Sequence, residues 1–441
     1  MGEPAERRTG IRVGGVPDSL SAFLTGDSSR DLRNMNILLE AIAAVNSNPG
    51  MDSLVVHIVD LALELTKAER GFLLLHEGQD LRVRASRGPG GRRLPPGERV
   101  PRTLPARVAR EGRAICQRDD ALPEGSDRSA TMADLDLRTV MCAPLRLKDR
   151  VLGVLYVDSR AEAREFGDSD LTLLSALATQ AAITLDGARL LEHYVEKQRI
   201  QQGLLIARDI QRALLPEGPL SLPGLDVHGT SVGCEETSGD YFDYIRTGEG
   251  RVGLVVGDVA GHGVPAALLM ATARALLRAF LRADADPAAT LGSLNACLCE
   301  DMAAGRFMTL FYGDLDVPRR RLSYVRAGHT PPLLLRAATG ECEELAAPGI
   351  ALGVEPDARY RASEPVEIGA GDVLFLFTDG IVETMSPGRE PFGVERAAAV
   401  LRRHGDRSAE EICVAMRRAV DAFRGSSPPE DDLTMIVARG L

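Results

Sequence analysis

Aspartates recur at four places in the second half of the sequence where an apolar run meets a turn. SGDYFD carries Asp240, VGLVVGDVAGHG carries Asp258, GDVLFLFTDGIVE carries Asp379, and EDDLTMIVAR carries Asp431 and Asp432. A carboxylate at the end of a buried strand loses its hydration and is costly to keep ionised unless a partner offsets its charge. Mg²⁺ and Mn²⁺ prefer carboxylate, carbonyl and water oxygens, so carboxylates from distant parts of the chain can converge on such ions.

The chemistry of such a centre is well defined. Two divalent ions about 3.5 to 4 Å apart lower the pKa of a water that bridges them, which gives a hydroxide for in-line attack on a phosphoryl group. The same ions offset the charge that develops on the phosphoryl oxygens, so no serine, cysteine or histidine nucleophile is required. Asp379 followed by Gly380 is, by itself, typical of a turn. The joint occurrence of these aspartates, two of which end markedly apolar strands, favours a metal centre.

A folded β core must position these side chains, and the sequence predicts one. Helical periodicity covers residues 264–282, 287–303, 393–404 and 408–424, and a turn is expected at Pro318 to Arg320. We expect the helices to cover the outer faces of the strands in an α-β-β-α sandwich. The predicted strands are LVVGDV, MTLFYGDLDV, RLSYVRAGH, PLLLR, VLFLFTDG and LTMIVAR.

The first half of the sequence predicts a separate α+β domain. Apolar stripes predict helices over 31–45 and 54–65, and strands follow in GFLLLHEG, QDLRVRASRG and the hairpin VMCAPLRLKDRVLGVLYVDS, with its turn at Lys148 and Asp149. Asp168 is expected to cap a long helix that begins near Leu171 and continues without a break to Pro216. The predicted division is a disordered tail over 1–30, a first domain over 31–190, a helical linker over 191–216 and a second domain over 217–441.

Composition narrows the class of protein. The 441 residues are 44% hydrophobic and 26% charged, which favours two or three folded domains over a disordered or fibrous chain. A net charge of -11 disfavours a nucleic-acid partner. We find no apolar run of about 18 residues and no secretory signal, and therefore expect a cytoplasmic protein without a membrane segment. The seven cysteines are scattered and include no CxxC pair, so we expect reduced core residues.

Two families share these motifs. The second half resembles the metal-dependent type-2C (PPM) serine/threonine protein phosphatases, in their bacterial SpoIIE/RsbU-like branch, over about residues 190 to 440. Over about residues 35 to 190, RTVMCAPLRLKDRVLGVLYVDS followed by FGDSDLTLLSALATQAAITLDGARL resembles a GAF domain, a small-molecule sensor and dimerisation module. Thr330 stands where the phosphatase branch often has Asn. The motifs that carry the phosphatase resemblance are, in order, ARDIQRALLP, SGDYFD, GDVAGHG, AGHTPPLLL, FTDGIVE and EDDLTMIV.

The phosphatase resemblance implies a role for each aspartate. Asp258 is the expected bridging ligand to two metal ions, with the backbone carbonyl of Val259 beside it. Asp379 and Asp431 are expected to complete the second metal. Asp240 is expected to hold the other metal, directly or through its waters.

Two points stay open within this set. Adjacent strand residues point to opposite faces, so only one of Asp431 and Asp432 can face the site; Asp431 is preferred and Asp432 is the alternative. His262 and His329 each follow a glycine in a turn. Either histidine is a candidate to protonate the leaving group or to order metal-bound water, or is a structural residue bonded to a backbone carbonyl.

The resemblance also implies a function. We expect metal-dependent hydrolysis of phosphoserine or phosphothreonine on a protein, with two Mn²⁺ or Mg²⁺ ions, under the control of the GAF-like domain. In related bacterial enzymes the substrate is typically a small phosphorylated anti-sigma-factor antagonist. The alternatives are a non-catalytic signalling scaffold that binds a phosphoprotein, and a hydrolase of small phosphate esters or nucleotides. The intact set of four carboxylate positions argues against the scaffold.

The long helix suggests how the two domains communicate. Ala181, Ala188, Leu191, Val195 and Leu205 fall on a seam with three-four spacing, which Gln198 and Gln202 interrupt. We therefore predict a homodimer through the GAF-like domain and the linker helix. An unidentified small-molecule effector, or a rearrangement of the dimer, would then be relayed through residues 180–215 to the phosphatase domain.

Overall fold

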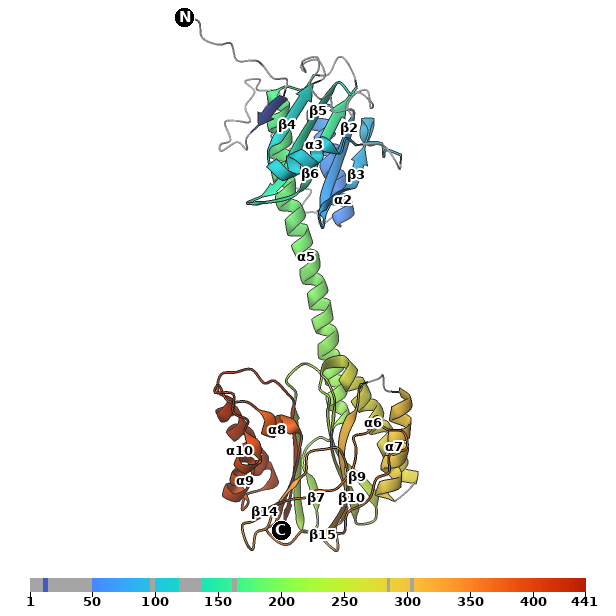
Figure 1. Ribbon diagram of the computed structural model, residues 1–441, viewed down its shortest axis with the longest axis vertical. Helices are drawn as coiled ribbons and strands as arrows, with labels where there is room; N and C mark the ends of the chain where they lie inside the picture. The colour runs from blue at the N-terminus through green and yellow to red at the C-terminus, as the bar shows by residue number, and fades with distance from the viewer. Residues whose placement is uncertain are drawn as a thin grey trace, which may run out of the picture. The chain divides into compact units, whose positions relative to one another are not determined.

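The computed structural model describes residues 11–14, 50–95, 100–118, 137–160, 165–283, 286–301 and 305–441. The chain divides into two compact units, Met1–Lys197 and Gln198–Leu441 (Figure 1). The predicted helix over 31–45 and most of the predicted tail lie outside the described residues. The exception is Ile11–Gly14, which forms strand β1 and pairs with β4 (Ala114–Arg118), so the prediction of a disordered tail is wrong for these four residues.

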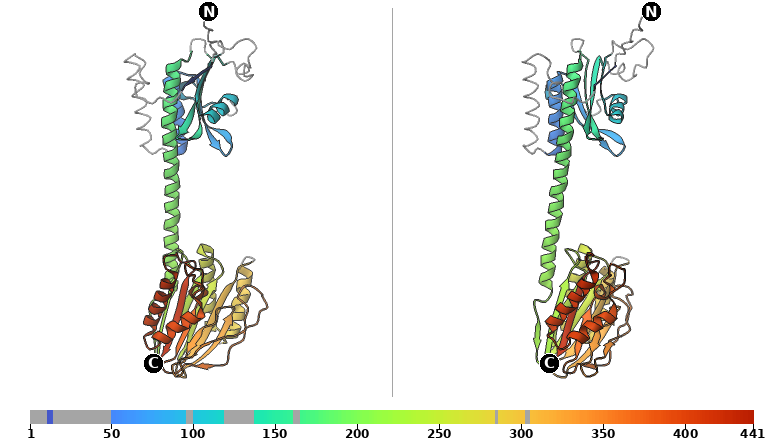
Figure 2. Two further views of the ribbon diagram at one scale, coloured as in Figure 1. Left: turned by 60° about the vertical axis from the view of Figure 1, so that its left-hand side comes forward. Right: turned by 90° about the vertical axis from the view of Figure 1, so that its left-hand side faces the viewer.

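The first unit is built on one antiparallel sheet with helices on both faces. Its strand order is β1-β4-β5-β6-β2-β3. Helices α2 (Met51–Thr66) and the first part of α5 (Asp168–Leu214) cover one face, and α3 (Thr103–Glu111) covers the other (Figure 2). The remaining elements are β2 (Arg70–Glu77), β3 (Asp80–Arg87), the short 3-10 helix η2 (Pro89–Gly91), β5 (Thr139–Leu147) and β6 (Arg150–Ser159).

The helix and strand predictions for this unit are confirmed where the structure describes them. The hairpin turns at Lys148 and Asp149, and Lys148 takes a left-handed φ of 52°. Helix α5 begins at Asp168 itself, three residues earlier than predicted, and runs unbroken to Leu214. The predicted helical linker is therefore part of α5.

The second unit consists of two sheets packed face to face, with a helical layer outside each. One sheet has the order β15-β12-β11-β10-β9 and the other β14-β13-β16-β17-β8-β7. The strands are β7 (Leu220–Leu222), β8 (Leu225–Val232), β9 (Asp240–Gly248), β10 (Arg251–Val259), β11 (Met308–Asp316), β12 (Arg321–Ala327), β13 (Leu333–Leu335), β14 (Cys342–Glu344), β15 (Val366–Glu367), β16 (Val373–Phe377) and β17 (Leu433–Gly440). The helices are α6 (Gly263–Ala283), α7 (Pro287–Asp301), α8 (Asp379–Glu383), α9 (Gly393–His404) and α10 (Ala409–Arg424).

Three hydrophobic cores hold these layers together. Val256 and Phe311 meet Leu376 in the hydrophobic core between the two sheets. Helices α6 and α7 pack on the outer face of the five-stranded sheet, and α9 and α10 pack on the six-stranded sheet (Figure 1). The predicted α-β-β-α sandwich is confirmed, and the chain as a whole has the α+β class expected.

Two helices correct the expectation that no segment is apolar enough to span a membrane. By length and composition alone, α5 and residues 263–282 of α6 meet that requirement. Some of the apolar residues in both helices belong to the cores of their units. Leu174 and Leu177 of α5, and Met270 and Leu277 of α6, are fully buried there.

Candidate active site

The pairing of β9 with β10 places two of the predicted aspartates opposite each other. Asp258 is the register partner of Asp240, and directly opposed residues of antiparallel neighbours project from the same face of the sheet. Gly239 allows a close approach here. A Cβ atom at this position would meet the Val259 carbonyl oxygen at 2.8 Å and Asp258 Oδ1 at 3.3 Å. The Asp258 carboxylate and the Val259 carbonyl therefore both lie near Gly239.

Asp240 is also tied to the other sheet. The Thr378 hydroxyl donates to Asp240 Oδ2 at 2.9 Å, and Thr378 directly precedes Asp379. The backbone N–H of Asp240 donates to the Ser238 hydroxyl oxygen at 3.0 Å. The end of β16 and the start of β9, far apart in the sequence, thus meet at one point.

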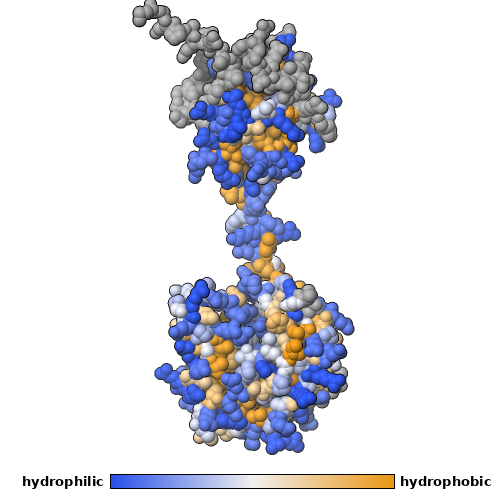
Figure 3. All heavy atoms as spheres, in the orientation of Figure 1, coloured by the Kyte–Doolittle hydropathy of each residue, from blue (hydrophilic) through white to orange (hydrophobic). Residues whose placement is uncertain are grey.

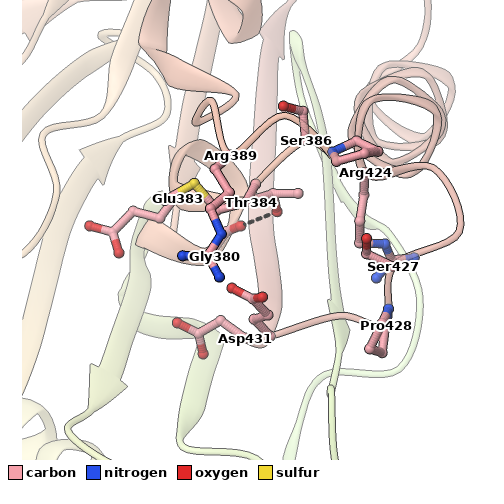
Figure 4. A pocket seen from close by; sticks show the side chains of 12 residues that line it. Gly380, Glu383, Thr384, Ser386, Arg389, Arg424, Ser427, Pro428 and Asp431 are labelled. Carbon is pink, nitrogen blue, oxygen red and sulfur yellow. Dashed lines mark hydrogen bonds between the residues drawn. The ribbon is translucent and has the colours of Figure 1, made fainter.

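Asp379 and Asp431 lie close together where helix α8 passes the residues just before β17. Gly380 allows this close approach. Asp379 is the first residue of the five-residue helix α8, where the sequence alone suggested a turn. A Cβ atom on the next residue, Gly380, would lie 2.1 Å from the Asp432 carbonyl oxygen and 3.3 Å from Asp431 Cβ. Figure 4 shows Asp431 beside Gly380.

Burial, together with the charge of neighbouring carboxylates, raises the pKa of each of the four aspartates. Burial, followed by the charges of Asp379 and Asp431, raises the pKa of Asp258 to about 7. Burial and the Asp258 charge raise the pKa of Asp240 well above its usual range. Burial also raises the pKa of Asp379 and of Asp431, where His262 acts in the opposite direction. Negative charge is therefore in excess in this region.

The protein itself supplies little to offset that charge. Across the described ranges, no lysine or arginine forms an ion pair with any of the four carboxylates. The same part of the chain contains no group of three or more His, Cys, Asp or Glu side chains arranged to hold a metal ion. The structure thus brings the four predicted carboxylates into one region without closing them into a ligand set.

Asp432 has a different environment from Asp431. Its Oδ1 accepts from the Cys234 N–H at 2.7 Å, and its Oδ2 accepts from the Ser238 hydroxyl at 2.6 Å and the Gly239 N–H at 3.1 Å. Asp432 is only 5% exposed, whereas Asp431 is exposed. Asp432 therefore fastens the loop before β9 to the start of β17, and three protein donors already occupy its oxygens.

The second acid of SGDYFD lies away from this region. The Arg278 guanidinium donates to both oxygens of Asp243 at 2.6 Å, and the Tyr241 hydroxyl donates to Asp243 Oδ2 at 2.7 Å. Asp243 is fully buried, so this ion pair connects β9 to α6 beneath the site.

The two histidines that sequence reasoning left open differ in their surroundings. His329 Nε2 lies 3.1 Å from the Phe377 carbonyl oxygen, which can only accept, so this nitrogen carries the proton. His329 Nδ1 then accepts from the Thr309 hydroxyl at 2.8 Å. Burial lowers the pKa of His329 to about 4, so the ring is neutral and both nitrogens are engaged. His329 is a structural residue, whereas His262 is exposed, with Nδ1 3.1 Å from Glu235 Oε1.

Gln211, near the end of α5, is a residue whose role sequence reasoning missed. Its side-chain amide donates to the Ser238 carbonyl at 2.6 Å and accepts from the Ser238 N–H at 3.0 Å. Ser238 in turn contacts Asp432 and Asp240. The only signal was the place of Gln211 within the ARDIQRALLP motif, which gives no hint of its partner.

A cavity of about 790 Å³ adjoins the aspartates. Gly380 and Asp431 form the part of its wall nearest the site, and the loop that begins at Thr384 and the residues after α10 form the rest (Figure 4). Asp240, Asp258 and Asp379 do not line it.

Two parts of this chain match known family models. Residues 248–440 match the family model described as Stage II sporulation protein E (SpoIIE), and residues 49–186 match the GAF domain model. The chain thus carries a domain that matches the SpoIIE model, preceded by a domain that matches the GAF model.

Individual proteins are also similar to parts of this chain. The chain is 28% identical over 187 residues to phosphoserine phosphatase RsbU of Bacillus subtilis, across 42% of this chain and 55% of RsbU. It is 30% identical over 273 residues to protein IcfG of Synechocystis sp., across 55% of this chain and 41% of IcfG. The chain therefore spans about half the length of the curated relatives it matches. Among solved structures, the SiaA-PP2C domain of Pseudomonas aeruginosa is 26% identical, with a TM-score of 0.48, and the match covers 56% of this chain and 98% of that domain.

Proposed function

We propose that this protein hydrolyses phosphoserine or phosphothreonine on a protein substrate in a metal-dependent reaction controlled by its GAF domain. The observation that carries the proposal is the meeting of Asp240, Asp258, Asp379 and Asp431 at one edge of the two sheets, where the pKa of each carboxyl is raised. Such an excess of negative charge suits a site built for cations.

The donor set fits two Mn²⁺ or Mg²⁺ ions. Every candidate ligand is an oxygen, namely the four carboxylates and the Val259 carbonyl, and hard divalent ions prefer oxygen ligands. Asp258 would bridge the ions, with Asp379 and Asp431 on one side and Asp240 on the other. When bound, such ions lower the pKa of a coordinated water and offset charge on a phosphoryl group.

The surrounding residues keep this set in place. Gly239 allows the Val259 carbonyl to approach the Asp258 carboxylate, and Thr378 orients Asp240. Asp432 and Ser238 fix the loop that leads into β9. His262, exposed and paired with Glu235, is the candidate to carry a proton to or from the leaving group.

The test compares hydrolysis of p-nitrophenyl phosphate by the full chain with Mn²⁺, with Mg²⁺ and with a chelator. Asp258→Asn should abolish metal-dependent turnover, whereas Asp406→Asn, at an exposed aspartate remote from the site, should leave it intact. Activity that survives both chelation and Asp258→Asn would refute the proposal.

The proposed substrate is a small phosphorylated anti-sigma-factor antagonist, supported by the similarity to phosphoserine phosphatase RsbU. Phosphopeptides and nucleotides at equal concentration separate this proposal from a hydrolase of small phosphate esters. Phosphoprotein binding without phosphate release, with metal bound, would instead indicate a non-catalytic scaffold. The net charge of -11 supports a protein that does not bind nucleic acid, and we further propose that it is cytoplasmic.

A homodimer through α5 is supported by apolar side chains that the helix leaves exposed (Figure 3). Leu191 and Val195 of the predicted seam are 50% and 57% exposed, and Leu205 is 41% exposed. Ala181 is wrong as a seam residue because it is buried in the core of the first unit. Analytical ultracentrifugation should show a dimer that Leu191→Glu weakens, while a monomer at micromolar concentration would contradict the proposal.

The proposed relay from the GAF domain gains support from Gln211. This residue joins α5 to Ser238, so a rotation or shift of the helix acts on the residue that contacts Asp240 and Asp432. Residues 198–441 alone should then lack the response to effector or dimerisation that the full chain shows. Identical activity of both forms under all conditions would remove the support for a relay.

A further inference from the structure

Three side chains lie in a row across the edge of the five-stranded sheet. Asp258 on β10 is the register partner of Asp240 on β9 and of Thr309 on β11. Directly opposed residues of antiparallel neighbours project from the same face of the sheet. This face is turned toward the six-stranded sheet, because Val256 and Phe311, two residues along the same strands, lie in the core between the sheets. Asp258, the proposed bridging ligand, is therefore the middle member of the row.

The end of β16 is hydrogen-bonded to the two outer members of this row. The Thr378 hydroxyl, directly after the strand, donates to Asp240 Oδ2 at 2.9 Å. The Phe377 carbonyl, the last of the strand, accepts from His329 Nε2 at 3.1 Å. His329 Nδ1 in turn accepts from the Thr309 hydroxyl at 2.8 Å. The end of one sheet is thus fastened to the other sheet at two points.

The surroundings of His329 suit a fixed connection. The residue is 2% exposed, and burial lowers its pKa to about 4, so the ring is neutral and offers one donor and one acceptor. Both nitrogens are already engaged, which leaves none to bind an ion or a substrate. The Arg326 guanidinium donates to the His329 carbonyl at 2.6 Å and to the Ala347 carbonyl at 2.7 Å, which holds the backbone that carries the ring.

This connection bears directly on Asp379, which lies two residues after Phe377. Burial, followed by the Asp379 charge, raises the pKa of Asp258, so these two carboxylates repel each other when both are ionised. The hydrogen bond from His329 to Phe377 keeps the strand end in place against that repulsion. Ligands already held near their binding positions lose less conformational entropy when an ion binds, so the ion binds more tightly.

We propose that the two hydrogen bonds of the His329 ring, called here the His329 link, set the position of Asp379 relative to Asp258. The link thereby determines how tightly the protein binds the ion that Asp379 completes. His329 is a positioning residue, because it acts through the Phe377 carbonyl and contacts neither the ion nor the phosphoryl group. This inference rests on the proposed metal-dependent function, and it adds the residue that sets the affinity for one of the two ions.

The test measures Mn²⁺ binding to the full chain without substrate, by isothermal titration calorimetry, and the stability of each variant by urea denaturation in chelator. His329→Leu removes both hydrogen bonds. Thr309→Val replaces only the hydroxyl of the link with a methyl group of similar size, so it tests the link even if His329→Leu does not fold. His329→Gln is the conservative variant, because an amide keeps one donor and one acceptor.

The matched control lies at the opposite end of the same strand. Asp372 directly precedes β16 and is 6% exposed. Its carboxylate accepts hydrogen bonds from the backbone N–H groups of Ala337 at 2.9 Å and Gly369 at 3.0 Å, and from the Arg336 side chain at 3.0 Å. Asp372→Asn therefore disturbs a buried polar residue beside β16 without touching the His329 link.

One of the two Mn²⁺ binding steps should weaken about tenfold in His329→Leu, at the low end of the roughly 10- to 100-fold losses that follow removal of a residue holding a metal ligand. Thr309→Val should weaken the same step by a smaller factor, and His329→Gln should keep most of the affinity. Asp372→Asn should be less stable in chelator but bind both ions as the wild type does. Unchanged Mn²⁺ affinity in every folded variant of the link, or an equal loss of affinity in Asp372→Asn, would overturn the inference.

The same titration, read beside hydrolysis of p-nitrophenyl phosphate, separates this inference from the proposed function. If the wild type binds no Mn²⁺, the metal-dependent function and the His329 link fail together. If the wild type binds and uses Mn²⁺ but the variants of the link bind it equally well, the inference fails alone. If Mn²⁺ affinity depends on His329 as expected but no phosphate ester or phosphopeptide is hydrolysed, the phosphatase proposal fails and the positioning role of His329 stands.

Discussion

The neighbouring residues Asp431 and Asp432 should respond in opposite ways to the same substitution. Asp432→Asn replaces one of two oxygens that together accept three hydrogen bonds from Cys234, Ser238 and Gly239. In the better orientation of the amide, the oxygen keeps Ser238 and Gly239, and the NH₂ group faces the Cys234 N–H. One bond to a charged acceptor is then lost, and a donor is left without a partner.

The size of the effect follows from these contacts. A hydrogen bond to a charged group contributes about 1.5 to 3 kcal/mol, and an unsatisfied buried donor costs about 1 to 3 kcal/mol. Removing the Asp432 charge also relieves repulsion with Asp240 and Asp258, which offsets part of the loss. We expect Asp432→Asn to lower the free energy of unfolding by about 2 kcal/mol. Asp431→Asn should leave it within about 0.5 kcal/mol of the wild type, because Asp431 is exposed and an amide oxygen can still accept from the Asp432 N–H.

Urea denaturation in chelator measures both values, and repeating it in Mn²⁺ adds the second half of the test. A bound ion stabilises the folded state according to its concentration and affinity. Asp431→Asn should lose most of the stabilisation by Mn²⁺, whereas Asp432→Asn should keep it on a lower baseline. The reasoning is refuted if Asp432→Asn is as stable as the wild type in chelator but no longer responds to Mn²⁺, since Asp432 would then be the ligand.

Three further outcomes are expected. The pKa of His329 in the folded protein is about 4, below the usual 6.5, so as the pH falls the unfolded state is protonated at this histidine first. The free energy of unfolding should therefore fall by up to about 3 kcal/mol between pH 6.5 and pH 4. Urea denaturation of His329→Asn should not show this pH-dependent loss. Arg278→Met leaves the buried Asp243 without its main partner, so it should lower the free energy of unfolding by about 3 to 5 kcal/mol in the same assay. Adding Asp243→Asn should recover part of this loss. A loss below about 1 kcal/mol for Arg278→Met would contradict this expectation. Gln211→Ala removes both hydrogen bonds to Ser238, so it should lower kcat for p-nitrophenyl phosphate more than it raises KM. The control is Gln202→Ala, at an exposed position of the same helix. An unchanged kcat would argue against an effect of α5 on the site through Ser238.

The sequence was sufficient to predict the elements whose pattern is local. The apolar runs that end near Asp258 and Asp379 became the buried strands β10 and β16, because strands inside a sandwich are covered on both faces. Helices α6, α7, α9 and α10 followed from their periodicity. Strand β8 was missed because His228, Gly229 and Thr230 interrupt any apolar alternation, and α8 was missed because five residues are too short to show a period.

The sequence motifs suggest which residues form the candidate site, but they do not reveal the residues that hold these in place. Asp258, Asp379 and Asp431 were identified from strand ends and motifs. The roles of Asp432 and Gln211 depend on partners 194 and 27 residues away, and no local pattern encodes such pairs. Only the tertiary structure decides that Asp432, rather than the adjacent Asp431, accepts hydrogen bonds from Cys234, Ser238 and Gly239.

The position of β17 has a consequence for how the protein is made. This strand lies between β16 and β8 in its sheet. Asp432, which directly precedes β17, accepts a hydrogen bond from Ser238, which is translated 194 residues earlier. A nascent chain in which β17 has not yet been synthesised lacks Asp431 and the hydrogen bond between Ser238 and Asp432. The proposed site is therefore complete only after β17 has paired with β16 and β8.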